Sequence, residues 1–104
     1  MNLPASTLTE DDLRHAIGRI IRTYLGHSPH VKIFLFGSRA TRHHTSRSDY
    51  DIGIEAAQPI PLEVLGRIQG ELDALPILPK IEVVDLCRVS EAFKREALAT
   101  AQAW

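Results

Sequence analysis

Two aspartates that alternate along one short segment, Asp49 and Asp51, are the residues of this chain best suited to chemistry. In an extended strand, side chains two positions apart point to the same face, so the two carboxylates would leave the backbone on one side, about 6.6 Å apart. The opposite face of that strand would carry Tyr50, Ile52 and Ile54. Carboxylates held this close repel each other, and a bound divalent cation removes the repulsion. The spacing therefore predicts a site for one Mg²⁺ ion or for a pair of them.

A glycine and a serine end an apolar segment a short distance upstream. Residues 33–36 form a run of strand type, and Gly37 can adopt backbone angles that other residues resist. The chain is therefore expected to turn at Gly37 and Ser38, where freed backbone N–H groups and the serine hydroxyl would suit phosphate oxygens. Two-metal sites serve in-line displacement at phosphorus, so the turn and the carboxylates together predict chemistry on a nucleoside triphosphate.

The connection between the turn and the aspartates is basic and contains no acid. Its basic residues are Arg39, Arg42, His43, His44 and Arg47. The guanidinium group is a planar fork that suits phosphate oxygens, so Arg39, next to the turn, is the candidate for binding the triphosphate tail, and Ser48 can add a hydroxyl. Neighbouring histidines tend to diverge, so His43 and His44 are expected to be solvated loop residues rather than a metal-binding pair.

A third carboxylate is expected on a later strand, over residues 80–86. Alternation places Glu82 on one face of that strand and Asp85 on the other, and periodicity alone does not choose between them. A purely structural alternative is that Glu82 is a surface acid paired with Lys80 or Arg88.

The stretch FLFGSRATRHHTSRSDYDIGIE, residues 34–55, resembles the signature of nucleotidyltransferases related to DNA polymerase β, and specifically the minimal nucleotidyltransferases of bacteria and archaea. The resemblance implies their α/β (α+β) nucleotidyltransferase fold, a small mixed β-sheet with helices packed on it. It selects Glu82 as the third carboxylate, at a position where family members commonly have Asp. The catalytic and metal-binding residues that it implies are Asp49, Asp51 and Glu82. The nucleotide-binding residues are Gly37, Ser38, Arg39 and Ser48.

The resemblance also implies a partner protein. Minimal nucleotidyltransferases look like one member of a two-gene pair, and the other gene of the pair encodes a helical HEPN-type protein. In some pairs that partner is a ribonuclease toxin, and the transferase is the antitoxin that adds AMP to it. The resemblance therefore implies Mg²⁺-dependent transfer of AMP from ATP to a hydroxyl, most simply a tyrosine, of such a partner. Two other interpretations stay open: a protein that keeps the fold but masks its partner without chemistry, and a metal-dependent phosphohydrolase, which would give no reason for the Gly37–Ser38 turn.

Length and composition predict one small domain over residues 1–104. A chain of 104 residues with 44% hydrophobic content can bury one core, which leaves no room for a separate acceptor-binding domain. The formal net charge of −1 argues against a general nucleic-acid or membrane binder. The single cysteine, Cys87, cannot form an internal disulfide, and neither a signal peptide nor a membrane-length apolar run is present. We therefore expect a soluble cytoplasmic protein.

Local patterns predict the elements that position these residues. Thr9, followed by three acids, is expected to cap a helix that Gly26 ends. Strands are expected over residues 31–36, 49–55 and 80–86, with a helix between the second and third that starts near Pro61. Ser90 is expected to cap a last helix that reaches Ala101. The order helix, strand, strand, helix, strand, helix predicts a small mixed sheet covered by helices.

Overall fold

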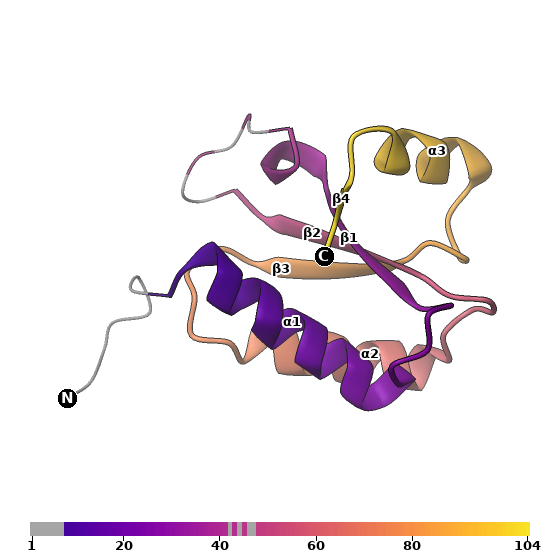
Figure 1. The fold of residues 1–104 in the computed structure, drawn as a ribbon, viewed down its shortest axis with the longest axis horizontal. Coiled ribbons are helices and arrows are strands. Elements are labelled where there is room, and N and C mark those ends of the chain that lie inside the picture. The colour runs from indigo at the N-terminus through magenta and orange to yellow at the C-terminus, as the bar shows by residue number, and fades with distance from the viewer. Residues whose placement is uncertain (1–7, 42, 44, 46–47) are drawn as a thin grey trace.

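A four-stranded sheet with helices on both faces forms the framework of the protein (Figure 1). The computed structural model describes residues 8–41, 43, 45 and 48–104. Its elements in chain order are α1 (Glu10–Leu25), β1 (Lys32–Phe36), the short 3₁₀ helix η2 (Gly37–Arg39), β2 (Tyr50–Glu55), α2 (Leu62–Asp73), β3 (Ile81–Asp85), α3 (Glu91–Ala99) and β4 (Gln102–Ala103). The strand order is β3-β2-β1-β4.

The sheet is mixed, which confirms the predicted fold class. Strands β1 and β2 are antiparallel, with Phe36 opposite Asp51, whereas β2 and β3 are parallel, with Asp51 opposite Glu82. A parallel pair needs a crossover connection, and α2 supplies it. The end of β1 and the starts of β2 and β3 consequently meet at one end of the sheet.

Helices α1 and α2 lie side by side on one face of the sheet, and α3 lies on the other (Figure 1). The main core is between the sheet and the first two helices, where Ile17 of α1, Ile52 and Ile54 of β2 and Ile68 of α2 have no exposed surface. Burying a side chain of this size contributes roughly 1.5 to 3 kcal/mol. The alternation predicted for β2 is therefore confirmed, because the apolar residues face this core and the intervening positions face α3.

The predicted helix ends are confirmed by their capping groups. The Thr9 hydroxyl accepts from the Asp12 N–H at 3.0 Å, and the Asp12 carboxylate accepts from the Thr9 N–H at 3.1 Å, which completes a capping box. Gly26 ends α1 with a φ of 80°. At the start of α3, the Ser90 hydroxyl accepts from the Phe93 N–H at 3.1 Å.

The C-terminal residues depart from the prediction. Helix α3 ends at Ala99, so Ala101 lies beyond it, and the chain then forms β4 beside β1. The Trp104 N–H donates to the Ile33 carbonyl at 2.8 Å, and the Gln102 side chain donates to the Ala40 carbonyl at 2.9 Å. Backbone pairing with β1 therefore overrides the helical preference of this alanine-rich segment. None of the helices in the described part of the chain is long and apolar enough to cross a membrane.

The outer edge of β3 is paired with a side chain. Gln69, on α2, donates from Nε2 to the Ile81 carbonyl at 2.7 Å and accepts at Oε1 from the Val83 N–H at 3.0 Å. The amide thus takes the donor and acceptor positions that a further strand would occupy.

Candidate functional site

The turn after β1 packs its backbone against the start of β2. Gly37 has a φ of 75°, in the left-handed region that favours glycine. Its carbonyl accepts from the N–H groups of Ala40 and Thr41 at 3.1 and 3.3 Å. A side chain at Gly37 would overlap the carboxylate of Asp51. The absence of a side chain here therefore lets the turn lie directly on this acid.

Three carboxylates lie at this end of the sheet. Asp51 is half-buried on the face of β2 turned away from α1 and α2, and Glu82, opposite it in the parallel register, is exposed. Asp49 is also exposed and immediately precedes β2, which begins one residue later than predicted. Burial raises the pKa of Asp51, and the charges of Glu82 and Asp49 raise that pKa further. A proton or a cation placed among these acids would relieve their repulsion.

These acids do not by themselves provide a complete set of ligands for a metal ion. In the described ranges, no three His, Cys, Asp or Glu side chains are gathered closely enough to hold a metal ion by themselves. Mg²⁺ is commonly held by one or two carboxylates together with substrate phosphates and water. The carboxylates repel one another, and their oxygens are hard ligands of the kind that Mg²⁺ prefers. They therefore suit a Mg²⁺ ion that also binds a phosphate group of the substrate.

Asp85 has a different environment and is only 2% exposed. Its carboxylate accepts from the N–H groups of Ile60 at 2.7 Å and Cys87 at 2.9 Å, and lies 3.4 Å from Nε of Arg88. Arg88 also donates to the Ile60 carbonyl. These contacts tie the segment before α2 to the end of β3, so Asp85 is a structural residue. Of the two acids that alternation left open, Glu82 is the one on the face of the other carboxylates.

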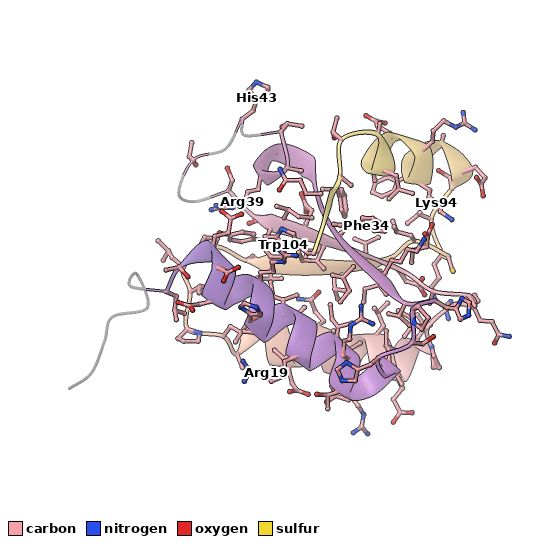
Figure 2. The ribbon with its side chains drawn as sticks, viewed as in Figure 1. Arg19, Phe34, Arg39, His43, Lys94 and Trp104 are labelled. Carbon is pink, nitrogen blue, oxygen red and sulfur yellow. The ribbon has the colours of Figure 1, made fainter. Side chains whose placement is uncertain are left out.

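Arg39 holds the backbone that leads into β2. Its Nε donates to the Ser48 carbonyl at 2.9 Å, and a terminal nitrogen donates to the Thr45 carbonyl at 3.3 Å. Its guanidinium carbon lies 3.9 Å from the centre of the Tyr50 ring. The Tyr50 ring in turn meets Trp104, at 6.1 Å between ring centres, and Figure 2 shows Arg39 and Trp104 on the same side of the molecule. Arg39, which is predicted to contact the triphosphate, therefore also anchors this loop.

The two serines of the predicted nucleotide set lie at the ends of the same connection. Ser38 is half-buried in η2, and its carbonyl accepts from the Thr41 hydroxyl at 3.1 Å. The Ser48 hydroxyl accepts from the Thr45 N–H at 3.0 Å. Ser48 immediately precedes Asp49, and Ser38 immediately follows Gly37, whose backbone rests on Asp51. The contact of either serine with a nucleotide stays a prediction.

The basic side chains of the loop are described only in part. His43 is exposed and points away from the sheet (Figure 2). The remaining basic residues of this segment, Arg42, His44 and Arg47, lie outside the described residues. The predicted attraction of this loop for a triphosphate therefore rests on its composition.

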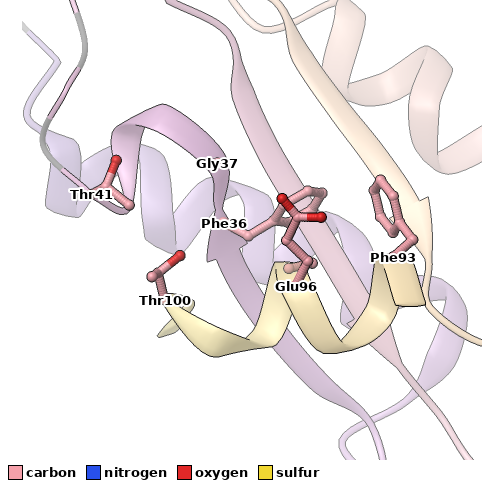
Figure 3. Close-up of a pocket in the computed structure, with 7 residues that line it drawn as sticks. Phe36, Gly37, Thr41, Phe93, Glu96 and Thr100 are labelled. Carbon is pink, nitrogen blue, oxygen red and sulfur yellow. The ribbon is translucent and has the colours of Figure 1, made fainter. Parts of the chain in front are cut away.

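A cavity of about 260 Å³ adjoins the turn on the α3 side of the sheet (Figure 3). Its lining consists of Phe36, Gly37, Thr41, Phe93, Glu96, Ala97 and Thr100. The sequence predicted a helix over the segment that contains Phe93 and Glu96, but it indicated no role for either side chain in the site. The available signal was their spacing, because residues three apart on a helix share a face, but only the fold shows that this face meets the Gly37 turn.

The chain matches the family model described as "Polymerase beta, Nucleotidyltransferase" over residues 19–103. That span includes the Gly37 turn, both aspartates and Glu82. None of the curated proteins matches the chain.

Solved structures share the fold at low sequence identity. A minimal nucleotidyltransferase structure has a TM-score of 0.67 and 19% identity, over 93% of this chain and 97% of the other. A structure of tri-AMPylated Shewanella oneidensis HEPN toxin in complex with MNT antitoxin has a TM-score of 0.61 and 20% identity, over 92% of this chain and 72% of the other. A toxin–antitoxin structure with AMP-PNP has a TM-score of 0.57 and 23% identity, over 85% and 72%. Likenesses at these identities establish the fold.

Proposed function

The chain belongs to the polymerase β nucleotidyltransferase family, and on that basis we propose that it transfers AMP from ATP to a hydroxyl group of a partner protein. The observation that carries this proposal is the packing of the Gly37 turn on Asp51, with Glu82 opposite on the next strand. It brings a backbone turn suited to phosphate and a set of hard oxygen ligands to one end of the sheet. Nucleotidyl transfer needs both.

The proposed roles follow from position. Gly37 and Ser38 would hold the β and γ phosphates through the backbone of the turn, and Arg39 and Ser48 would border them on the loop side. Asp49, Asp51 and Glu82 would hold Mg²⁺, with two ions expected. The bound metal would neutralise phosphate charge and orient the phosphates for in-line displacement.

The proposed reaction is a single displacement at the α-phosphorus. The acceptor hydroxyl attacks, a bond forms between its oxygen and the α-phosphorus, and the bond to the oxygen bridging toward the β-phosphorus breaks, so that pyrophosphate leaves. Glu82 is exposed and lies on the face of the other acids, where its carboxylate can take the proton of the acceptor. Positioning and charge neutralisation supply most of the catalysis in this class of reaction.

The proposed acceptor is a tyrosine of a HEPN-type helical protein, which makes the chain the antitoxin of a toxin–antitoxin pair. Two observations support this assignment. The elements of the described residues form one small sheet with its covering helices, and none of them forms a separate domain that could hold an acceptor. Two solved structures with the same fold are toxin–antitoxin structures. One is an MNT antitoxin in complex with a tri-AMPylated HEPN toxin, and the other contains AMP-PNP.

A second candidate function is masking of the same partner without chemistry. It is favoured by the open arrangement of the acids, since Asp49 and Glu82 are exposed and the described residues hold no finished three-ligand site. Glu82 is also one methylene longer than the Asp that is common in the family, and on this second interpretation the longer side chain weakens the binding of a second metal ion.

The experiment mixes the purified chain with its HEPN-type partner, ATP and Mg²⁺ and measures the intact mass of the partner. We expect the mass to rise by one or more AMP groups, and Asp51→Asn to prevent the rise. Asp11→Asn, which removes the same charge from the exposed first turn of α1, should leave the modification intact. A partner that stays unmodified and is neutralised equally well by the wild type and by Asp51→Asn would support masking instead.

A further inference from the structure

The cavity beside α3 and the carboxylate of Asp51 both adjoin the Gly37 turn, and Phe36, which lines the cavity, lies opposite Asp51 on the neighbouring strand. Gly37 lines the cavity, and its backbone also rests on the carboxylate of Asp51. A ligand that places a charged group at the turn can therefore extend a second group into the cavity without leaving the protein surface. Figure 3 shows the opening between the Gly37–Thr41 segment and α3.

The lining of the cavity does not suit phosphate. It contains no Lys or Arg, and its one charged side chain is the carboxylate of Glu96. A carboxylate repels phosphate oxygens at close range. If the phosphates lie at the turn, the group that enters the cavity is the uncharged end of the nucleotide.

Two phenylalanine rings give the cavity an aromatic wall. Phe36 is buried beneath it, and Phe93 stands edge-on to Phe36 with 6.0 Å between ring centres. Phe93 nevertheless keeps 42% of its surface exposed, although it belongs to a helix that packs on the sheet. A planar base that stacks on Phe93 would remove this apolar surface from water.

Glu96 and Thr41 offer acceptors to the cavity, and Thr100 adds a hydroxyl that can donate or accept. The Glu96 carboxylate accepts hydrogen bonds and does not donate them. The Thr41 hydroxyl already donates to the Ser38 carbonyl at 3.1 Å, so it presents lone pairs to the cavity. In Figure 3, Glu96 rises from α3 beside the Phe36 ring. An occupant that carries an amino group would match this lining.

We propose that this cavity is the nucleobase subsite of the transfer site, in which Phe93 stacks on the base and Glu96 accepts from its exocyclic amino group. The inference rests on the proposed function and adds a rule for substrate choice: the site takes an amino-substituted purine. The volume of about 260 Å³ is below the range of about 300 to 1,000 Å³ that is typical of sites for drug-sized ligands, so it fits a purine ring system rather than a whole nucleotide.

The test compares two nucleotides that differ in one group, ATP and purine riboside triphosphate, which lacks the exocyclic amine. Their dissociation constants for the full chain are measured by calorimetry with Mg²⁺ present. We expect the wild type to prefer ATP by about tenfold, the value of a hydrogen bond to a charged acceptor. Glu96→Ala should abolish this preference. Glu91→Ala, which removes the same charge from another turn of α3, should retain it.

Stacking is tested separately with Phe93→Leu, which keeps an apolar side chain and removes the ring. This variant should bind both nucleotides about tenfold more weakly, since base stacking on an aromatic side chain is lost. In the wild type, nuclear Overhauser effects should connect the base protons with the Phe93 ring.

Each other outcome overturns the inference. Equal affinity of the wild type for the two nucleotides, or a preference that survives Glu96→Ala, removes the role of Glu96. Unchanged affinity of Phe93→Leu without base contacts removes the subsite, and if that variant binds the HEPN-type partner less well, the cavity belongs to the partner. Failure to bind any nucleotide would reject the proposed function together with this subsite, whereas binding without these effects would reject the subsite alone.

Discussion

The guanidinium carbon of Arg39 lies 3.9 Å from the centre of the Tyr50 ring, while its Nε donates to the Ser48 carbonyl at 2.9 Å. Ser48 and Tyr50 are the two neighbours of Asp49 in the chain. Arg39 therefore holds the backbone of Ser48 before Asp49 and the ring of Tyr50 after it, and it does so with a planar group that a lysine cannot reproduce.

Arg39→Gln should weaken the binding of Mn²⁺ to the nucleotide-free protein by about tenfold, as loss of an outer partner of a metal ligand does. Removal of a nearby positive charge should on its own strengthen cation binding, so the predicted sign is opposite to the simple charge effect. Electron paramagnetic resonance of free Mn²⁺ measures the affinity.

Two further variants separate positioning from charge. Arg39→Lys keeps the charge and should also weaken Mn²⁺ binding, whereas Arg19→Gln, on α1 away from Arg39 (Figure 2), should have little effect. Unchanged or tighter Mn²⁺ binding by Arg39→Gln would limit this residue to contact with the nucleotide.

Gly37→Ala and Gly26→Ala form a matched pair. Both glycines have positive φ, 75° and 80°, so each substitution should lower the free energy of unfolding by about 1 to 3 kcal/mol. A Cβ at Gly26 meets open space, whereas a Cβ at Gly37 overlaps the Asp51 carboxylate. Only Gly37→Ala should therefore lose Mn²⁺ binding and transfer beyond its effect on stability. Equal losses in the two variants would show that the turn does not control the acid.

Asp51→Asn should stabilise the metal-free protein at neutral pH. Burial, with the charges of Glu82 and Asp49, raises the pKa of Asp51 in the folded state above its ordinary value of 3.8. A carboxyl group whose pKa is raised by folding stabilises the folded state at pH values below its pKa in the unfolded chain. That stabilisation is lost as the pH rises through its pKa in the folded protein. The gain from Asp51→Asn should therefore be present at neutral pH and shrink in acid.

Urea unfolding at several pH values, with a chelator present, measures this dependence. The wild type should approach the stability of Asp51→Asn as the pH falls, and added Mg²⁺ should stabilise the wild type more than the variant. A variant that is less stable than the wild type at neutral pH without metal would mean that Asp51 makes favourable contacts in the folded protein.

Glu82→Gln and Asp85→Asn should fail in opposite ways. Glu82 is exposed beside Asp51, so Glu82→Gln should keep the free energy of unfolding and lose transfer by at least about a hundredfold, because metal binding and proton acceptance each contribute several kcal/mol. Asp85 is buried and bonded to two backbone N–H groups, so Asp85→Asn should cost about 1 to 3 kcal/mol of stability and leave transfer by the folded protein nearly intact. Thermal unfolding and transfer assays on the same samples compare them, and the reverse ranking would reassign the third carboxylate.

Local rules predicted the parts of the fold that depend on neighbouring residues. The Thr9 cap, the Gly26 helix end and the alternation around Asp51 follow from capping and strand geometry, and each is present. The positive φ at Gly37 also follows from residue type. These features need no knowledge of distant segments.

Features that depend on long-range contacts could not be predicted in this way. The segment after Ala99 has helical composition, and it becomes β4 because β1 offers it free backbone groups. Alternation separated Glu82 from Asp85 but did not rank them, whereas the contact of Asp85 with the Ile60 N–H does. The engagement of Arg39 with loop carbonyls likewise requires the folded loop.

The pairing of Gln69 with the outer edge of β3 restricts how another protein can approach the acids. Exposed strand edges attract strands of other chains, which leads to strand addition or aggregation. The Gln69 amide occupies the backbone groups of Ile81 and Val83, on either side of Glu82, so a new strand would have to displace it. The other outer strand, β4, has only two residues, and short edge strands resist such addition. A macromolecule that brings a hydroxyl to Glu82 is therefore expected to dock on the face of the sheet that carries the acids rather than extend the sheet by a strand.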